Sequence, residues 1–460
     1  MKKQICTTTL LRTVLIVALW ISAPFGFGQT PKVSSEMKKQ TIDELSTLLG
    51  AKYGNKETGQ KLQELFQQNL KSGRYDSIDT LEEFHGIVNQ ELHSVVSDRH
   101  LALFYSPEAA PAADSSKNNS SAPAAEERAK EAAKFARQMN CGFKSAQFLN
   151  GNIGYLRLDY FDSYLDYARP VVDAALAFLR NSDAVIIDLR ENGGGSSTMV
   201  GYLAGFFFDE RTLVGTSYDR LTDTTSEEYQ DPQPEEKRLS SVDLYVLTSK
   251  RTTSAAEALA YRLKYHRKGK VIGEPSAGAA NPGRIYRLNA LFTAFIPNRY
   301  GKSSVTGTNW EGTGVPVDIV CLAEDALHVA RIEALKRTRE KATDPQQIKK
   351  FANYITYLEA TRSESILPEE VLQQYVGEYR GERTITISKD SLQNARLHYS
   401  KVADPGGILH FISEDRFMCS EGDLTITFKR DEKHRVVGME TQWSLSDSHH
   451  TTRTVAARIQ

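Results

Sequence analysis

Apolar residues in the first quarter of the chain recur with the period of an α-helix. Two sets fall on single helical faces: Leu62, Leu65, Phe66 and Leu70, then Leu81, Phe84, Val88, Leu92 and Val95. Thr80 and Glu83 have the spacing of a capping box at the start of the second set. The pattern predicts helices over about 36–97, and it changes to an extended pattern in "SDRHLALFY" (97–105).

From about 147 to 322, short apolar runs alternate with amphipathic stretches. Buried strands are predicted at "IGYLRL", "AVIIDLR" and "VDLYVLTS", and a helix at "DYARPVVDAALAFLR". The segments "KVIGE", "RIYRLNALFTAFIP" and "GVPVDIV" are expected to continue the same sheet, and long helices follow to about 362. After about 368, short alternating strands such as "LTITFKR" and "VVGMETQW" predict a small β-barrel or sandwich.

The N-terminus has the pattern of a secretory signal. Lys2, Lys3 and Arg12 precede an apolar stretch, and small residues flank a cleavage position before Gln29. Downstream there is no apolar run of about 18 residues, so no membrane span is expected once the signal is removed. These features predict export to the periplasm or the exterior of a bacterium.

Five regions are therefore expected along the chain. They are a signal peptide (1–28), an N-terminal helical domain (29–105), an Ala/Pro/Ser-rich linker with a short helix (106–146), a core with trailing helices (147–365) and a C-terminal β-barrel-like domain (366–460).

Composition excludes some classes of function. A formal net charge of −1 over 460 residues provides no basic surface for nucleic acid. Cys141, Cys321 and Cys419 have no CxxC spacing, which argues against a zinc site or a disulfide framework. His410, His449 and His450 lack supporting ligands. No metal or cofactor is predicted.

Ser254 stands where a predicted strand gives way to a helix, in "TSKRTTSAAEALAYRLK" (248–264). With Glu257 it forms a capping box, and a helix cap is the commoner meaning of that spacing. A serine at this place also has its hydroxyl near backbone amides and the positive end of a helix. Catalysis by a serine hydroxyl also requires a general base and hydrogen-bond donors for the oxyanion.

The sequence has candidates for those roles, each with an ordinary alternative. Gly194 and Gly195 follow a strand, where glycines usually serve a tight turn, but with Ala255 they could donate amides to an oxyanion. His100 alone would be a surface histidine, and Glu311 alone a solvated loop carboxylate.

Four motifs together resemble the C-terminal-processing and tricorn-type serine peptidases: "AVIIDLRENGGGSS", "TSKRTTSAAEALAYRLK", "VIGEPSAGAANPG" and "NWEGTGVPVDI". "LHSVVSDRHLALFY" resembles the histidine motif of the branch that contains interphotoreceptor retinoid-binding protein. The resemblance implies Ser254 as nucleophile, His100 as base, Glu311 as a polarising group, and Ala255 with Gly194 or Gly195 as oxyanion donors.

Two residues depart from the family pattern. Ala279 stands where the Ser–Lys enzymes carry lysine, which excludes the dyad mechanism, and Arg99 stands where tricorn-like enzymes tend to carry serine. Asp98 is then a possible orienting group for His100. No PDZ-like segment is present, so substrate would be held by the helical region or the core.

Pattern and resemblance together predict an α/β core, a mixed sheet with helices of the crotonase-like ββα type, between an N-terminal helical bundle and a small all-β domain. The expected function is an exported serine peptidase that acts on peptide or protein substrates. A carrier of apolar, retinoid- or lipid-like ligands on the same fold and an esterase or amidase remain alternatives.

Overall fold

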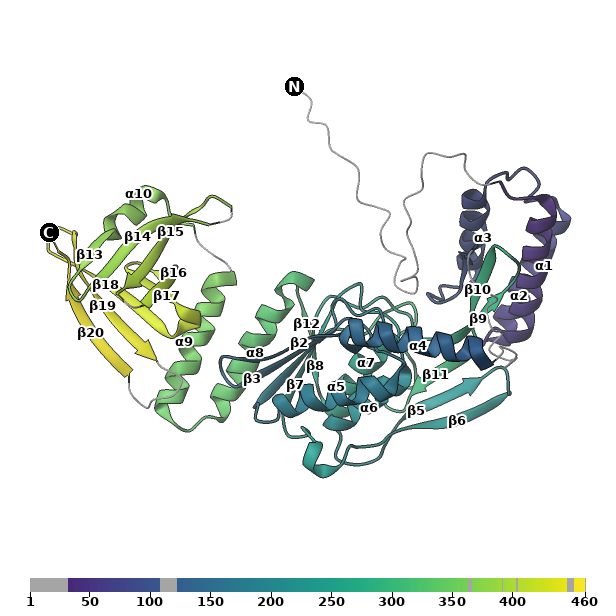
Figure 1. The fold of residues 1–460 in the computed structure, drawn as a ribbon, viewed down its shortest axis with the longest axis horizontal. Helices are drawn as coiled ribbons and strands as arrows, with labels where there is room; N and C mark the ends of the chain where they lie inside the picture. Colours follow the sequence, from purple (N-terminus) through teal and green to yellow (C-terminus); the bar gives the residue numbers. More distant parts are fainter. Residues whose placement is uncertain are drawn as a thin grey trace, which may run out of the picture. The chain divides into compact units, whose positions relative to one another are not determined.

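A computed structural model describes residues 32–107, 122–362, 366–390, 392–402, 404–444 and 451–459. The predicted signal peptide, residues 108–121 of the predicted linker, and His449 and His450 lie outside these ranges. The chain divides into two compact units (Figure 1). The first comprises residues up to Ala146, Leu156–Arg180 and Ile187–Ala323, and the second Gln147–Tyr155, Asn181–Ile186 and Glu324 onward. No helix within the described ranges is long and apolar enough to cross a membrane.

The predicted N-terminal helices are confirmed. They are α1 (Ser35–Lys52), α2 (Lys56–Lys71) and α3 (Leu81–Val95). Each begins after a polar cap whose side chain accepts a backbone N–H of the first turn: Ser34, Asn55 and Thr80 respectively. The cap predicted at Thr80 is thus present.

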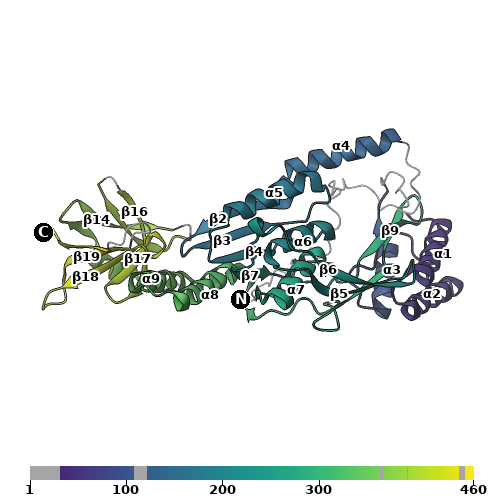
Figure 2. The same ribbon diagram turned by 90° about the horizontal axis from the view of Figure 1, so that it is seen from below.

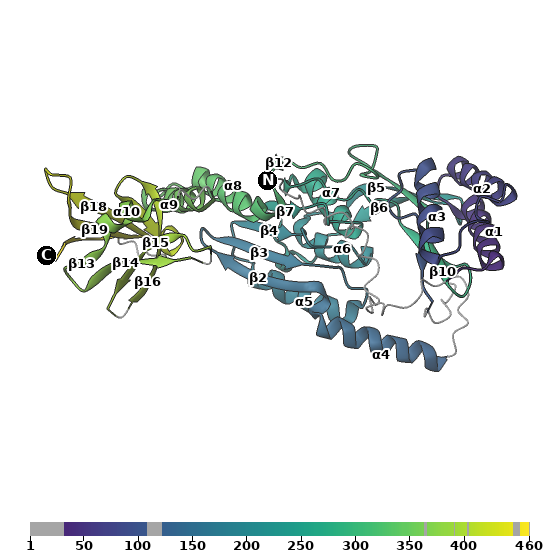
Figure 3. The same ribbon diagram turned by 90° about the horizontal axis from the view of Figure 1, so that it is seen from above.

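The apolar faces of these helices bury against a small sheet assembled from distant parts of the chain. β1 (Ala102–Tyr105) pairs antiparallel with β10 (Phe292–Pro297), which pairs with β9 (Gly283–Arg287). Figures 2 and 3 show α1, α2 and α3 beside this sheet, and their leucines and phenylalanines share one core with it. The prediction that 284–297 continues the central sheet is therefore wrong. The alternating Phe292, Ala294 and Ile296 of β10 are buried in the core of the N-terminal helices instead.

The central sheet has the order β12-β8-β7-β4-β3-β2. Its strands are β2 (Phe143–Leu149), β3 (Ile153–Leu158), β4 (Ala184–Asp188), β7 (Asp243–Thr248), β8 (Lys270–Gly273) and β12 (Ile319–Val320). β7, β8 and β12 run parallel, and every residue of β4 is buried. The strands predicted at "IGYLRL", "AVIIDLR" and "VDLYVLTS" are confirmed.

Helices follow the strands of this sheet. α5 (Leu165–Phe178) comes after β3, α6 (Ser197–Ala204) after β4 and α7 (Ala255–Arg267) after β7, and the three lie side by side (Figure 2). The turns that open α6 and α7 carry the predicted glycines and Ser254. α4 (Ala122–Gln138) precedes the sheet, and a three-stranded sheet of β5 (Thr212–Asp219), β6 (Thr224–Gln230) and β11 (Arg299–Ser303) completes this part.

The second unit contains α8 (Ala326–Lys341), α9 (Pro345–Arg362), the one-turn α10 (Glu369–Leu372) and an eight-stranded antiparallel sheet in sequence order. The strands are β13 (Gly377–Tyr379), β14 (Arg383–Lys389), β15 (Ala395–Lys401), β16 (Asp404–Ser413), β17 (Arg416–Cys419), β18 (Leu424–Arg430), β19 (Val436–Ser444) and β20 (Thr451–Ala457). A bridge between Tyr379 and Arg458 links the first strand to the end of the last. The predicted all-β region is confirmed as a nearly closed sheet, with aromatic and aliphatic side chains in its core.

Candidate active site

Ser254 lies in the turn between β7 and α7, in a backbone conformation that residues with side chains rarely adopt. Its φ of 58° and ψ of −117° are tolerated by glycine, whereas other residues reach them under a strain of about 1–3 kcal/mol. Ser34, Thr80 and Ser196 cap their helices from the ordinary extended region, with φ of −75°, −106° and −74°. Capping therefore does not require the geometry of Ser254, whereas a nucleophile elbow is a strained strand-to-helix turn of this kind.

The glycine-rich turn after β4 lies directly against Ser254. A β-carbon added at Gly194 would lie 2.9 Å from Ser254 Cβ and 3.2 Å from the amide nitrogen of Ala255. One added at Gly195 would lie 2.1 Å from the carbonyl oxygen of Phe161. Since φ is also positive at both glycines, 102° and 127°, neither position admits a side chain. The structure thus places Gly194, Ser254 and Ala255 next to one another.

The amides around Ser254 differ in their availability to a ligand. The N–H of Gly194 donates to Asn192 Oδ1 at 2.9 Å. Among the described residues, the N–H groups of Gly195 and Ala255 have no hydrogen-bond acceptor. Of the three predicted oxyanion donors, Gly195 and Ala255 are therefore the two whose amides are open, while Gly194 provides a close packing contact.

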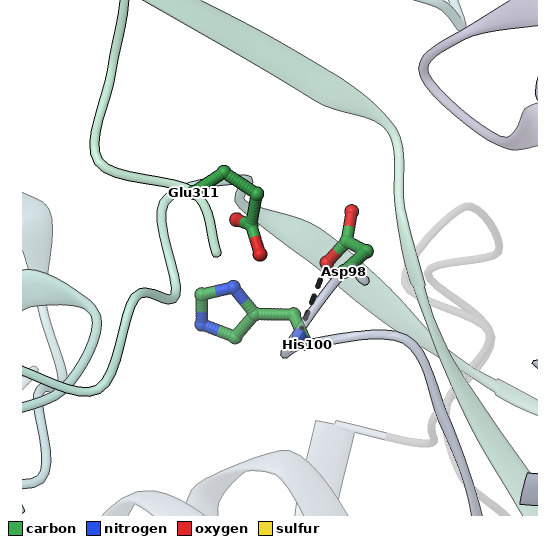
Figure 4. Close-up of side chains that lie close together, drawn as sticks. All are labelled: Asp98, His100 and Glu311. Carbon is green, nitrogen blue, oxygen red and sulfur yellow. Dashed lines mark hydrogen bonds between the residues drawn. The ribbon is translucent and has the colours of Figure 1, made fainter. Parts of the chain in front are cut away.

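His100 belongs to a second cluster, with Asp98 and Glu311. One ring nitrogen of His100 and one carboxylate oxygen from each of the two acids lie within 4.8 Å of one another. The His100 ring also stacks on Phe295 of β10, with ring centroids 5.4 Å apart. In Figure 4 the Glu311 carboxylate points toward the ring edge that carries Nδ1, and Nε2 points away from both carboxylates. Nδ1 is buried and has no hydrogen-bond partner among the described residues.

Glu311 is held by backbone amides on both sides. Its Oε1 accepts the N–H of Arg99 at 2.9 Å, and its Oε2 accepts those of Ala280 at 2.6 Å and Asn281 at 3.1 Å. Burial and the neighbouring Asp98 raise the pKa of Glu311 to about 7, although the three amides act in the opposite direction. This carboxyl group therefore titrates near neutral pH.

Asp98 is buried and holds the backbone of His100 rather than its ring. Asp98 Oδ1 accepts the His100 N–H at 3.1 Å, and Oδ2 accepts the Tyr53 hydroxyl at 2.9 Å and Asn281 Nδ2 at 3.0 Å. Burial lowers the pKa of His100, and the charge of Asp98 opposes that shift. The imidazole is consequently neutral, and able to accept a proton, at neutral pH.

A short segment before β9 connects the two clusters. The N–H of Ala279 and that of Ser254 both donate to Glu257 Oε2, each at 2.8 Å, while the next amide, Ala280, donates to Glu311. Since consecutive Cα atoms are 3.8 Å apart, this path from Ser254 to the Glu311 carboxylate is at most roughly 12 Å. The hydrogen bonds of the described residues include none between the Ser254 hydroxyl and the imidazole, so the clusters are neighbours that are not directly bonded.

Asp98, His100 and Glu311 also have the composition of a metal site. Each of the four carboxylate oxygens, however, already accepts an N–H or O–H donor from the protein. The set is therefore better suited to anchoring the surrounding loops than to coordinating an ion.

Comparison with known proteins bears directly on these two clusters. Residues 152–321 match the model of peptidase family S41, and residues 32–145 match that of the N-terminal domain of peptidase S41 in eukaryotic IRBP. The two matches together account for more than half of the chain. The chain belongs to peptidase family S41.

Individual relatives of this S41 chain are similar over shorter stretches. Carboxyl-terminal-processing peptidase 2, chloroplastic, of Arabidopsis thaliana is 32% identical over 139 residues, which are 30% of this chain and 26% of that protein. Tail-specific protease of Haemophilus influenzae is 30% identical over 115 residues, 25% of this chain and 16% of that protein. The chain thus matches about a quarter or less of these relatives. The photosystem II D1 C-terminal processing protease superposes with a TM-score of 0.41 at 17% identity, covering 64% of this chain and 94% of that one.

Several residues of the candidate site were not identified from the sequence. Glu257 was interpreted only as half of a capping box, and nothing local indicates that its carboxylate binds a segment some twenty residues further on. Asn192 and Tyr53 were also missed, although the position of Asn192 in "ENGGG" is a signal that could have drawn attention to it. The Tyr53 hydroxyl and the side-chain N–H of Asn192 donate to Asp98 and to the Leu158 carbonyl oxygen, which only the fold brings near them.

Proposed function

We propose that this protein is a serine-type peptidase that acts through an acyl-enzyme, with Ser254 as nucleophile and His100 as general base. The observation that carries the proposal is the strained backbone of Ser254 beside the open amides of Gly195 and Ala255. Strain of this kind persists only where the surrounding structure imposes it, and it concentrates at functional sites.

The reaction proceeds in two halves. Ser254 Oγ attacks the carbonyl carbon of the peptide bond while its proton passes to His100 Nε2, and the Gly195 and Ala255 amides stabilise the oxyanion by roughly 3 kcal/mol each. The imidazolium then returns the proton to the leaving amine nitrogen as the C–N bond breaks, which leaves an ester on Ser254. Water attacks that ester while one of its protons passes to His100, and the imidazolium then protonates Ser254 Oγ as the ester C–O bond breaks, which releases the carboxylic acid and restores the serine.

Glu311 stabilises the imidazolium that forms during each half-reaction. Its carboxylate points toward the Nδ1 edge of the His100 ring (Figure 4), and a negative charge at that edge favours protonation at Nε2. Asp98 fixes the backbone of His100 through its N–H. The bond between Ser254 and His100 forms when substrate binds, because catalytic hydrogen bonds often tighten only in the substrate complex.

A pocket of about 360 Å³ beside the second cluster supports a peptide as substrate. Asp98, Asn281 and Glu311 line it together with residues of the α1–α2 turn and of β11. Its lining combines these polar groups with apolar surface, and a peptide, with its polar backbone and mixed side chains, can match both. The names of the two relatives, a processing peptidase and a tail-specific protease, agree with a protein or peptide substrate.

The finer predictions of fold and location belong to the same proposal. The parallel β7, β8 and β12 with helices following the strands support a crotonase-like core. The basic residues and apolar stretch before Gln29 support export to the periplasm or the exterior. The boundaries predicted at 105, 146 and 365 also remain predictions.

Labelling with a fluorophosphonate probe tests the proposal. The probe should modify Ser254, as mapped by mass spectrometry of digested protein, and a peptide library should be cleaved by the unlabelled protein only. Cleavage of small esters without any peptide would support the esterase alternative. If the protein is neither labelled nor cleaves peptides or esters but binds a retinoid or lipid, the carrier alternative would be supported and the peptidase proposal overturned.

Activity should fall as the pH decreases from 8 to 6, with a midpoint near 7. Below that pH Glu311, with its pKa of about 7, becomes neutral and no longer stabilises the imidazolium. Glu311→Gln should lower kcat by about tenfold to a hundredfold and shift the midpoint below about 6.5, where protonation of His100 alone removes the base. Profiles of kcat/KM against pH check this, and an unchanged midpoint in the variant would contradict it.

A further inference from the structure

Glu257 is fully buried, with an exposed fraction of 0%, yet its carboxylate has no cationic partner among the described residues. Four donors surround it instead. Oε1 accepts the Ser276 hydroxyl and the Gly278 N–H, both at 2.6 Å, and Oε2 accepts the N–H groups of Ser254 and Ala279, both at 2.8 Å. Burial raises the pKa of Glu257 while these hydrogen bonds lower it.

Helix capping does not account for this arrangement. Glu83 occupies the same place in the turn that opens α3, three residues after its cap, and its side chain is exposed. A capping glutamate needs only the amide of the cap residue as a donor. Glu257 has that donor and three more from a segment some twenty residues away, so its contacts are tertiary.

We propose that Glu257 is a positioning residue: it holds Ser254 in its strained conformation and joins it to the segment that also binds Glu311 beside His100. The inference rests on the proposed peptidase function and adds to it a group that never touches substrate. Its carboxylate acts through the Ser254 backbone, which places both the hydroxyl and the following Ala255 amide.

The segment that Glu257 binds is itself fixed. Gly278 has φ of 86°, and a β-carbon there would lie 3.0 Å from the amide nitrogen of Gly314. A β-carbon on Gly314 would lie 2.3 Å from the carbonyl oxygen of Ser276, and Ser276 Oγ also accepts the N–H of Val315 at 2.7 Å. Because two backbone segments pack this closely, the position of Ala279 and Ala280 is transmitted to both Glu257 and Glu311.

Removing the negative carboxylate should let Ser254 relax. In Glu257→Gln, whichever way the amide is placed, its NH₂ group faces two of the four donors, so two hydrogen bonds are lost. A displacement of about 1 Å at a reacting group costs roughly a hundredfold in rate. The expected result is a kcat about a hundredfold lower, with KM within about threefold of the original.

The experiment compares Glu257→Gln with the matched control Glu83→Gln in the full chain. For each protein we would measure kcat and KM on one cleaved peptide, the rate of fluorophosphonate labelling, and the melting temperature. The control should leave kcat and labelling unchanged. A Glu257→Gln protein that melts earlier but keeps the original kcat and labelling rate would show a purely structural role and overturn the inference.

A second variant covers the case in which Glu257→Gln does not fold. Ser276→Ala removes one donor from Oε1 and leaves the carboxylate in place, and it should lower kcat by about tenfold. An unchanged kcat in this variant would also overturn the inference. Failure of the peptidase proposal itself is distinguishable, because then the unmodified protein would show no labelling at Ser254.

Discussion

Replacing Ser254 by glycine should abolish peptidase activity and at the same time raise the melting temperature. The hydroxyl that forms the acyl-enzyme is lost, so kcat should fall by on the order of ten-thousandfold or more. Glycine adopts φ of 58° and ψ of −117° without the strain of about 1–3 kcal/mol that serine bears there. At about 2 kcal/mol, the middle of that range, release of the strain exceeds the few tenths of a kcal/mol by which glycine is a poorer cap and the roughly 0.4–1 kcal/mol by which glycine's freedom favours the unfolded chain.

The control for Ser254→Gly is Ser34→Gly at the cap of α1. Ser34 has φ of −75° and ψ of 152°, so glycine relieves nothing there and only adds freedom to the unfolded chain. The melting temperature of the control should therefore fall slightly, and its activity should not change. Calorimetry on both variants checks the difference. A Ser254→Gly protein that melts like the control and keeps its activity would reduce Ser254 to a helix cap.

Replacing His100 by alanine should lower kcat by about ten-thousandfold or more and stop fluorophosphonate labelling of Ser254. Without the imidazole no group accepts the serine proton, and the hydroxyl is a weak nucleophile at its ordinary pKa. The ring stacks on Phe295 with centroids 5.4 Å apart, so its removal leaves a ring-sized space. Added imidazole should enter that space and restore part of the activity in proportion to its concentration.

The control for this variant is His93→Ala, an exposed histidine in the last turn of α3. It should change neither kcat nor labelling, and imidazole should have no effect on it. A His100→Ala protein that is still labelled at the original rate would assign the base to another residue and would leave Ser254 as the nucleophile.

Local sequence was sufficient for the elements with clear periodicity. The helical face of Leu62, Phe66 and Leu70 lies within α2, and the apolar run "AVIIDLR" contains β4. β6 (Thr224–Gln230) was not expected, because six of its seven residues are exposed and its sequence shows no alternation of apolar and polar residues. The place of β10 was also mistaken, since its buried residues are equally suited to a central sheet and to the N-terminal core.

The candidate site was predictable only in part and for a definite reason. Ser254, His100 and Glu311 came from motifs, which identify residue types but not hydrogen bonds. That the side chain of Asn281 donates to Asp98, or that the N–H of Ala280 donates to Glu311, depends on how loops from different regions meet. Glu257 shows the limit most clearly, because its three remote donors lie 19 to 22 positions away in sequence.

The shared core of α1–α3 and β10 has a consequence for engineering and for evolution. The N-terminal region that carries His100 does not form this core alone, since five of the 21 buried residues of the core come from residues 283–297. If the N-terminal region were transferred to a different hydrolase without residues 283–297, part of its apolar core would therefore be exposed to water. A substitution in the core of the N-terminal helices must be accommodated by residues 283–297, and the reverse also holds. The two segments are therefore expected to vary together.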